Sequence, residues 1–229
     1  LISKVATARI SPRECMQLQI ALEALVPIKD TCQNSSETTI KNIGKQINVC
    51  QEIKQKIEKQ LHPNPPALLS KGNVINVGVN SELDELRAIS ISAKEVLQQI
   101  LERESQVTGI PSLKISFNNV FGYYLEVRNM HKDKVPEDWI RKQTLVSAER
   151  YITEELKEYE SKILTAEEKI KELEQKLYQD LVLSLTKFIA PIQLNARLIA
   201  KLDCLYCFAF ISKKYNYKKP IIDNSKSLL

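Results

Sequence analysis

Apolar residues recur every three or four positions through most of this chain, the spacing that gives an α-helix one buried face. The pattern predicts long helices over residues 11–27, 36–61, 81–109 and 153–191, and a further apolar helix to residue 208. A connector over residues 62–80 holds three prolines and two glycines, so it is predicted to break the helical pattern and lie on the surface.

Signals for the helix boundaries accompany this pattern. Ser11, Pro12 and Glu14 predict a capping box, in which the serine hydroxyl and the glutamate carboxylate satisfy backbone N–H groups at the helix start. Pro27 lacks an N–H donor and is predicted to end that helix. Further boundary predictions are N-terminal caps at Ser81 and Thr153, a C-terminal stop at Gly109 and a kink at Pro191.

Residues 112–127 change to a period of two, which is typical of strands. A two-residue Asn118-Asn119 loop would pair Phe117 with Val120 and would place glycine and tyrosine on the apolar face. A three-residue loop would pair Phe117 with Phe121 and would put every strongly apolar residue on one face, so we favour it. Phe117, Phe121 and Tyr123 are then expected in the sheet core, and Tyr124 on the polar face.

Residues 139–153 allow two interpretations. They can form a second hairpin with strands at 139–144 and 149–152, or a helix, because LVSAER contains no residue that breaks helices. We favour the hairpin. In either case these residues lie between two long helices.

The helix that follows has a coiled-coil seam over three heptads, at Leu156, Tyr159, Ile163, Ala166, Ile170, Leu173 and Leu177. Because the strands interrupt two long helices, they must lie at the far end of an antiparallel helical pair. The expected fold is mainly α with a small antiparallel β insertion. The expected parts are first-half helices over residues 1–109, a sheet over 110–153, and returning helices over 154–229.

Composition narrows the class of protein. With 43% hydrophobic residues in 229, the chain can bury a core and is not disordered. No apolar run approaches the roughly 18 residues that a membrane helix needs, and LISKVATARI is not a secretory signal. Five cysteines, an odd number, argue against a disulfide framework, so we expect a cytoplasmic protein.

Little in the chain points to catalysis. The sequence has two histidines and contains neither GxxxxGK[ST] nor GxGxxG, so we expect no enzyme and no cofactor in this segment. Cys204 and Cys207 have the spacing of a metal or redox pair. They lie in an apolar helical stretch without a second pair, so two buried thiols on a packed helix are expected. The net charge of +5 is compatible with nucleic-acid binding without requiring it.

Three segments carry a resemblance: GIPSLKISFNNVFGYYLEV, WIRKQTLVSAERYITEELKEYESKIL and NSELDELRAI. They closely resemble the lever and clamp region of the MutS family of DNA mismatch-repair proteins, and SPREC and ARLIAKLDCLYCFA extend the likeness over nearly the whole chain. The sequence departs from the family pattern at Glu154, where proline is common, but a glutamate near a helix N-terminus is also favourable.

The resemblance implies a function. In this family two subunits close around duplex DNA, and long lever helices carry a clamp sheet that holds the DNA backbone. The family's mismatch-reading segment and its ATPase domain, with ATP and Mg²⁺, have no counterpart here, so a central fragment is expected. The implied partners are double-stranded DNA and a MutS-type subunit, with no membrane and no small-molecule substrate. A fragment of a MutS-like paralogue, or a coiled-coil arm for protein interaction, is the alternative.

The residues expected to contact DNA lie on the polar face and at the hairpin tips. Cationic side chains neutralise phosphates, and amides and hydroxyls donate to phosphate oxygens without reading bases. The alternative is that these residues bind nothing and are simply the solvent-exposed face and turn residues of a hairpin, since asparagine is common in tight turns. The predicted set is Lys114, Asn118, Asn119, Lys142, Gln143, Thr144, Ser147 and Arg150.

Overall fold

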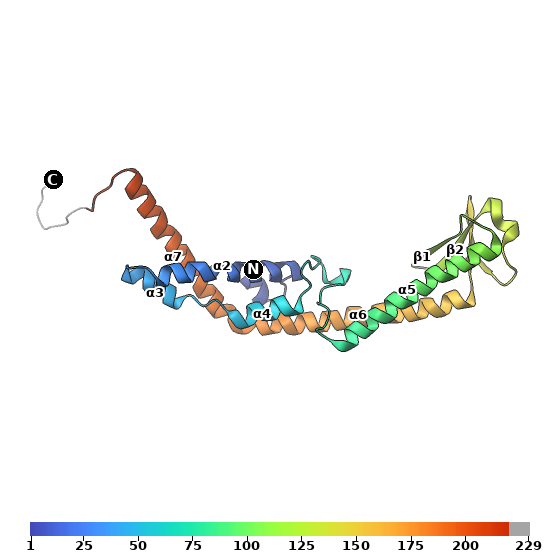
Figure 1. Cartoon of the computed structure of the whole chain (residues 1–229), viewed down its shortest axis with the longest axis horizontal. Coiled ribbons are helices and arrows are strands. Elements are labelled where there is room, and N and C mark those ends of the chain that lie inside the picture. The colour runs from blue at the N-terminus through green and yellow to red at the C-terminus, as the bar shows by residue number, and fades with distance from the viewer. Residues whose placement is uncertain (220–229) are drawn as a thin grey trace, which may run out of the picture. The chain divides into compact units, whose positions relative to one another are not determined.

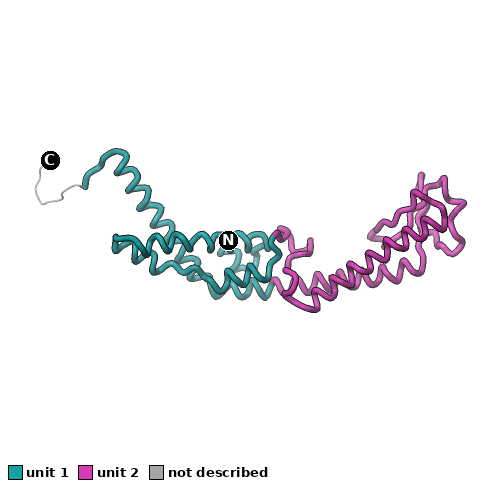
Figure 2. The backbone as a smooth tube through the Cα atoms, viewed as in Figure 1, with its two compact units in different colours: residues 1–63, 179–229 teal, residues 64–178 magenta. Residues whose placement is uncertain are grey.

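The computed structural model describes residues 1–219 and divides the chain into two compact units (Figure 2). Leu1–Pro63 and the chain from Gln179 onward form the first unit, and Asn64–Tyr178 form the second. Among the described residues, no helix has both the length and the apolarity that crossing a membrane requires.

The first unit is helical (Figure 1). Its helices are α1 (Ile2–Ala6), α2 (Pro12–Gln33), α3 (Thr38–Gln46), α4 (Gln51–Gln60) and α7 (Ile189–Lys214), with a short 3₁₀ turn, η3 (Thr186–Phe188), before α7. The predicted capping box is confirmed: the Ser11 hydroxyl accepts the Glu14 N–H, and the Glu14 carboxylate accepts the Ser11 N–H at 2.9 Å.

The prediction that Pro27 ends the first long helix is wrong, because α2 continues to Gln33. An interior proline costs roughly 3 kcal/mol through its missing N–H and its ring. Packing beyond the proline offsets this cost. Cys32 is buried against α3, where an added Cβ on Gly44 would come within 2.8 Å of the Cys32 Cβ. The backbones of α2 and α3 therefore approach closely at this pair.

The single helix predicted over residues 36–61 is two helices. The chain turns between α3 and α4 through Cys50, which has a left-handed backbone with φ of 48°. Asn195 of α7 supplies partners for this break: its Oδ1 accepts the Asn48 N–H at 2.9 Å, and its Nδ2 donates to the Asn48 carbonyl at 2.6 Å. A side chain distant in sequence thus satisfies the backbone that the break exposes.

The long helix was expected to kink at Pro191. It is interrupted a few residues earlier, at the 3₁₀ turn, and Pro191 lies in the first turn of α7. The prediction of buried thiols at Cys204 and Cys207 is wrong, since both are exposed. Buried residues of α7 lie only in its first half, up to Leu198. The apolar pattern of the second half was therefore a poor guide to burial in this unit.

The second unit contains two helices, a sheet and two short 3₁₀ turns (Figure 1). Its elements are η1 (Leu69–Lys71), α5 (Ser81–Thr108), β1 (Lys114–Asn118), β2 (Gly122–Arg128), η2 (Asn129–Lys134), β3 (Ile140–Thr144), β4 (Ala148–Ile152) and most of α6 (Glu154–Leu185), whose residues from Gln179 belong to the first unit. The Gly109 stop is confirmed by its left-handed backbone, and the Thr153 cap by its hydroxyl, which accepts the Leu156 N–H at 3.1 Å. The N-cap of α5 is Asn80, where Ser81 was predicted.

Ion pairs along α5 and α6 show that the two helices run antiparallel, as predicted. Arg87 pairs with Glu174, Lys94 with Glu167 and Arg103 with Glu155, so positions rise along α5 as they fall along α6.

The connector before α5 lies less on the surface than predicted, because Val74 and Ile75 are buried. The Val74 N–H donates to Glu174 Oε1 at 3.3 Å, and Arg87 Nη2 donates to the Ile75 carbonyl at 2.7 Å. A buried Arg87–Glu174 pair thereby holds the connector against the helices.

The sheet is antiparallel, with strand order β1-β2-β4-β3, so the second hairpin is confirmed and the helical alternative for residues 139–153 is excluded. One face packs on the second half of α5 and the start of α6. Its apolar cluster comprises Ala93, Leu97, Ile100, Ile110, Leu113, Leu125, Val127, Trp139, Tyr151, Leu156 and Ile163. The small sheet thus lies where the two helices are interrupted, as expected.

The register of the first hairpin differs from the prediction by two residues. Phe117 lies opposite Tyr123 rather than Phe121, and Asn118 lies opposite Gly122. A shift of two keeps the strand side chains on their predicted faces. Phe121, which was predicted in the sheet core, instead lies in the turn and is only half-buried. Phe117 is nevertheless 46% exposed, so its place in the core was wrongly predicted; it contacts Tyr123, with ring centroids 5.0 Å apart.

Candidate nucleic-acid interface

The face of the sheet that points away from α5 and α6 is polar. In the register, Lys114 lies opposite Glu126, and Glu126 lies opposite Arg150, so these side chains share one face. Leu125 and Val127 alternate with them and are buried on the other face. The outward face, here called the polar face, carries Lys114, Ser116, Asn118, Tyr124, Glu126, Arg128, Gln143 and Arg150.

Arg150 lies at the centre of the polar face. Its guanidinium stacks 4.5 Å from the centroid of the Tyr124 ring, and Nη1 donates to Gln143 Oε1 at 2.8 Å. Its Nε lies 3.5 Å from a Glu126 carboxylate oxygen. Tyr124 lies on the polar side as predicted, but it is only 5% exposed because this cluster covers it. Arg150 and Gln143, both predicted to contact DNA, therefore bind each other within the sheet.

Two further cations of this unit show how carboxylates hold positive charge. Lys94 pairs with Glu167 on the helices, and Arg141 pairs with Glu149 at 3.3 Å on the sheet. The hydrogen bond from the Tyr151 hydroxyl lowers the pKa of Glu149, and nearby Arg141 lowers it further. Glu149 thus stays charged and holds Arg141 to the sheet edge.

Three exposed cations on the sheet have no ion-pair partner within residues 1–219: Lys114, Arg128 and Lys142. An ion pair neutralises the charge of its cation. The three unpaired cations therefore determine the excess positive charge of the sheet surface. Lys114 and Lys142 were predicted; Arg128 was missed. The alternation through Tyr124 and Glu126 places Arg128 on the polar face, so the sequence did contain a signal for it.

The predicted residues at the turns have different roles. The Asn118 side chain accepts the Val120 N–H at 2.7 Å and so shapes the first hairpin turn, whereas Asn119 is exposed. Ser147 and Thr144 are exposed at the second hairpin turn. Each turn therefore presents polar groups to solvent at a different end of the sheet.

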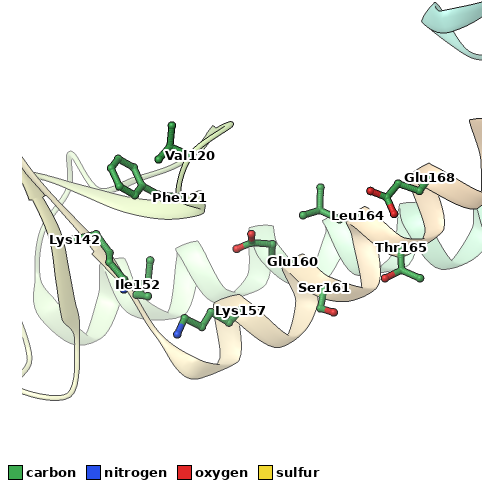
Figure 3. A pocket seen from close by; sticks show the side chains of 10 residues that line it. All are labelled: Val120, Phe121, Lys142, Ile152, Lys157, Glu160, Ser161, Leu164, Thr165 and Glu168. Carbon is green, nitrogen blue, oxygen red and sulfur yellow. The ribbon is translucent and has the colours of Figure 1, made fainter.

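Lys142 lies at a register shift in β3, between Arg141 and Gln143. It borders an open groove of about 490 Å³ that runs between the first hairpin turn and α6 (Figure 3). The predicted residues thus fall into three groups. Lys114 and Ser147 lie at one end of the polar face, Gln143 and Arg150 at its centre, and Asn118, Asn119, Lys142 and Thr144 at turns and strand edges.

Comparisons with known proteins agree with this arrangement. The family model "MutS family domain IV" matches residues 78–169, which include α5, the sheet and the start of α6. The chain is 58% identical over 226 residues to the DNA mismatch repair protein MutS of Phocaeicola vulgatus, covering 99% of this chain and 26% of that protein. It is 57% identical over 228 residues to MutS of Bacteroides fragilis, and 55% identical over 228 residues to MutS of Flavobacterium johnsoniae, covering 100% of this chain and 26% of each relative. The chain therefore spans about a quarter of the length of these relatives.

Proposed function

This chain belongs to the MutS family of DNA mismatch repair proteins, and we propose that its sheet holds duplex DNA through phosphate contacts that do not depend on base sequence. The observation that carries the proposal is the charge on the sheet. Lys114, Arg128 and Lys142 lack acidic partners within residues 1–219, while Arg141 and Arg150 are held by carboxylates. Cations that no carboxylate neutralises are the groups that phosphates attract.

The neighbouring groups suit a backbone contact. Exposed Asn119, Thr144 and Ser147 offer short amides and hydroxyls, which donate to phosphate oxygens and fix position without identifying bases. The candidate surface is a sheet with two turns. The proposed grip is therefore general for duplex DNA.

The two helices supply the proposed connection to the rest of the protein. The apolar cluster joins sheet residues to Leu97 of α5 and to Leu156 and Ile163 of α6, so sheet and helix ends form one packed body. A force on the sheet would pass directly into both helices. We propose that they transmit the state of the grip to domains outside this chain.

Other features of the whole protein are proposed on the family's pattern. We place ATP and Mg²⁺ binding outside this chain, which has no GxxxxGK[ST] segment, and we assign this chain a binding role without catalysis. A second MutS-type subunit would complete the ring around DNA. The expected compartment is the cytoplasm, because bacterial chromosomal DNA lies there.

A salt titration tests the proposal. Full-length protein carrying Lys142→Gln should bind a fluorescein-labelled homoduplex more weakly than wild type. The slope of log K against log salt should fall by about 0.9 for each phosphate that the protein no longer neutralises. Lys169→Gln, which removes an exposed charge from α6, is the matched control and should behave as wild type. If Lys142→Gln and Lys114→Gln both keep the wild-type affinity and slope, the sheet is not the DNA grip.

A further inference from the structure

One end of the polar face contains a polar hollow of about 450 Å³, lined by Ser112, Lys114, Glu126, Arg128, Ser147 and Ala148. We propose that this hollow is an anion site that takes one phosphate group of the duplex backbone, with Ser112 as a neutral donor and Lys114 and Arg128 as the charges. This inference rests on the proposed DNA grip and deepens it. It assigns roles to Ser112 and Arg128, which the predicted set did not include.

Three separate segments build the hollow. Ser112 lies in the turn before β1 and Lys114 at the start of that strand, Arg128 comes from the end of β2, and Ser147 from the turn before β4. The antiparallel order β1-β2-β4 brings the start of β1, the end of β2 and the start of β4 to the same end of the sheet. Such a site depends on the folded sheet, since the residues are scattered in sequence.

Ser112 is the unusual member of the set. Its Oγ atom is buried and has no hydrogen-bond partner among residues 1–219. A buried hydroxyl without a partner is destabilising, and such groups in native proteins call for an explanation. Turned towards the hollow, this hydroxyl would donate to a phosphate oxygen and gain the partner that it lacks.

The charges of the hollow also favour an anion. Glu126 is its one acidic lining residue, and its carboxylate forms an ion pair with Arg150 on the adjacent strand. Lys114 and Arg128 form no ion pair with any residue in the described range 1–219. With Arg150 included, three cationic groups face one carboxylate, so the region has excess positive charge.

The wall formed by the second hairpin turn is held in place. Asn129 donates its backbone N–H to the Ser147 carbonyl at 3.1 Å, and its Nδ2 donates to the Val146 carbonyl at 2.9 Å. These bonds fix the turn beside the end of β2. The backbones of Ser147 and Arg128 are therefore held beside each other before a ligand binds, which lowers the ordering cost of binding.

The shape of the hollow suits a polymer phosphate. It is open to solvent on the exposed polar face, and its lining contains one apolar side chain, the methyl group of Ala148. An apolar ligand would gain little there. A phosphodiester offers two charged oxygens to Lys114 and Arg128, and the open side lets the strand continue in both directions.

The test separates hydroxyl from charge in full-length protein binding a labelled homoduplex. Arg128→Gln should lower the salt slope by about 0.9, because one phosphate is no longer neutralised. Ser112→Ala removes a hydrogen bond to a charged group but no charge, so it should weaken binding about tenfold at unchanged slope. Lys142→Gln tests the grip outside the hollow, and Lys169→Gln is the charge control.

The outcomes distinguish the two proposals. If Ser112→Ala and Arg128→Gln both behave as wild type while Lys142→Gln lowers the slope, the hollow is not a phosphate site and the grip stands. If Arg128→Gln lowers the salt slope but Ser112→Ala binds as wild type, Arg128 is a surface contact and the proposed phosphate site in the hollow is wrong. If Lys142→Gln and Lys114→Gln also behave as wild type, the grip and the hollow both fail. Thermal melting monitored by circular dichroism confirms that each variant is folded.

Discussion

The Glu160 carboxylate on α6 lies directly over Gly122 and accepts the backbone N–H of Tyr123 at 3.2 Å. Gly122 begins β2 with a positive φ of 76°, and a Cβ added there would overlap the Glu160 carboxylate. The missing side chain therefore serves two purposes: it allows the left-handed backbone, and it lets a helix carboxylate reach the strand. This contact fastens the first hairpin to α6.

Gly122→Ala is expected to destabilise the 229-residue chain by about 2–3 kcal/mol in urea denaturation. Roughly 1–2 kcal/mol comes from the left-handed backbone of a residue with a Cβ. Roughly 1 kcal/mol more comes from the Glu160 hydrogen bond that the new methyl group displaces.

The matched control is Gly78→Ala. Gly78 also has a positive φ, of 81°, but an added Cβ would meet nothing within 4 Å. This variant should show the backbone cost alone. Equal destabilisation at the two glycines would mean that the Glu160 contact contributes nothing to stability.

Removing one partner of the Arg87–Glu174 pair should destabilise the second unit strongly. The Glu174 side chain is 1% exposed, and its oxygen Oε1 accepts from Arg87 Nη2 at 2.6 Å. Arg87→Met leaves this carboxylate buried without its cation, so a destabilisation of about 3–5 kcal/mol is expected on thermal or urea unfolding.

Arg103→Met is the control for that change. Arg103 is 53% exposed and pairs with Glu155 and Glu104 at the surface, where such pairs contribute about 0–1 kcal/mol. A destabilisation at Arg87 no larger than at Arg103 would contradict the interpretation that the buried pair anchors the connector.

The stability of the fold should fall at alkaline pH because the Tyr151 phenol ionises. Burial, with the nearby Glu149 carboxylate, raises the pKa of Tyr151 from 10.0 to about 12. The fold thus favours the neutral phenol. Its contribution is complete below pH 10, where unfolded tyrosine is also neutral, and is lost as the pH rises towards 12.

Urea unfolding of the chain between pH 9 and about 12 measures this decline in stability. Tyr151→Phe should lower stability at neutral pH because its hydrogen bond to Glu149 is absent, but its stability should fall less steeply above pH 10 than that of wild type. Tyr206→Phe changes an exposed ring and should keep the wild-type dependence. Identical alkaline slopes for Tyr151→Phe and wild type would refute the assignment.

The period-two pattern and the favoured loop predicted which face each strand residue of the first hairpin occupies, because the observed register differs by an even number of residues and so keeps side-chain direction. It did not predict the register. Gly122 adopts the left-handed backbone and closes the hairpin opposite Asn118, leaving residues 119–121 as the loop. Glycine at this position was a usable signal, since three-residue hairpin loops commonly need one left-handed residue.

The helix boundaries in the first unit depended on interactions distant in sequence. Residues 36–61 contain no proline, yet Asn195 stabilises a break there by bonding the Asn48 backbone across 147 positions. Pro27 is a strong local signal, yet α2 continues because Cys32 beyond it packs against Gly44. Tertiary packing overrides local preference in both cases.

The residue types of the candidate site were predictable, but their partners were not. Lys114 and Arg150 look alike in the sequence, as cations on the polar face. The structure separates them: Arg150 is stacked on Tyr124 and bonded to Gln143, whereas Lys114 is exposed. Contacts between neighbouring strands decide which cation is free to bind a phosphate. These contacts follow only from the register of the strands.

Arg150 should therefore serve the sheet more than the DNA. Arg150→Lys keeps the charge but removes the Gln143 hydrogen bond and the planar stack on Tyr124. A destabilisation of about 1–2 kcal/mol in urea unfolding is expected, with an unchanged salt slope for homoduplex binding by the full-length protein. Lys142→Arg, a charge-conserving change at an exposed position, should alter neither quantity. If Arg150→Lys keeps wild-type stability but weakens DNA binding, the guanidinium contacts phosphate directly and the internal cluster is secondary.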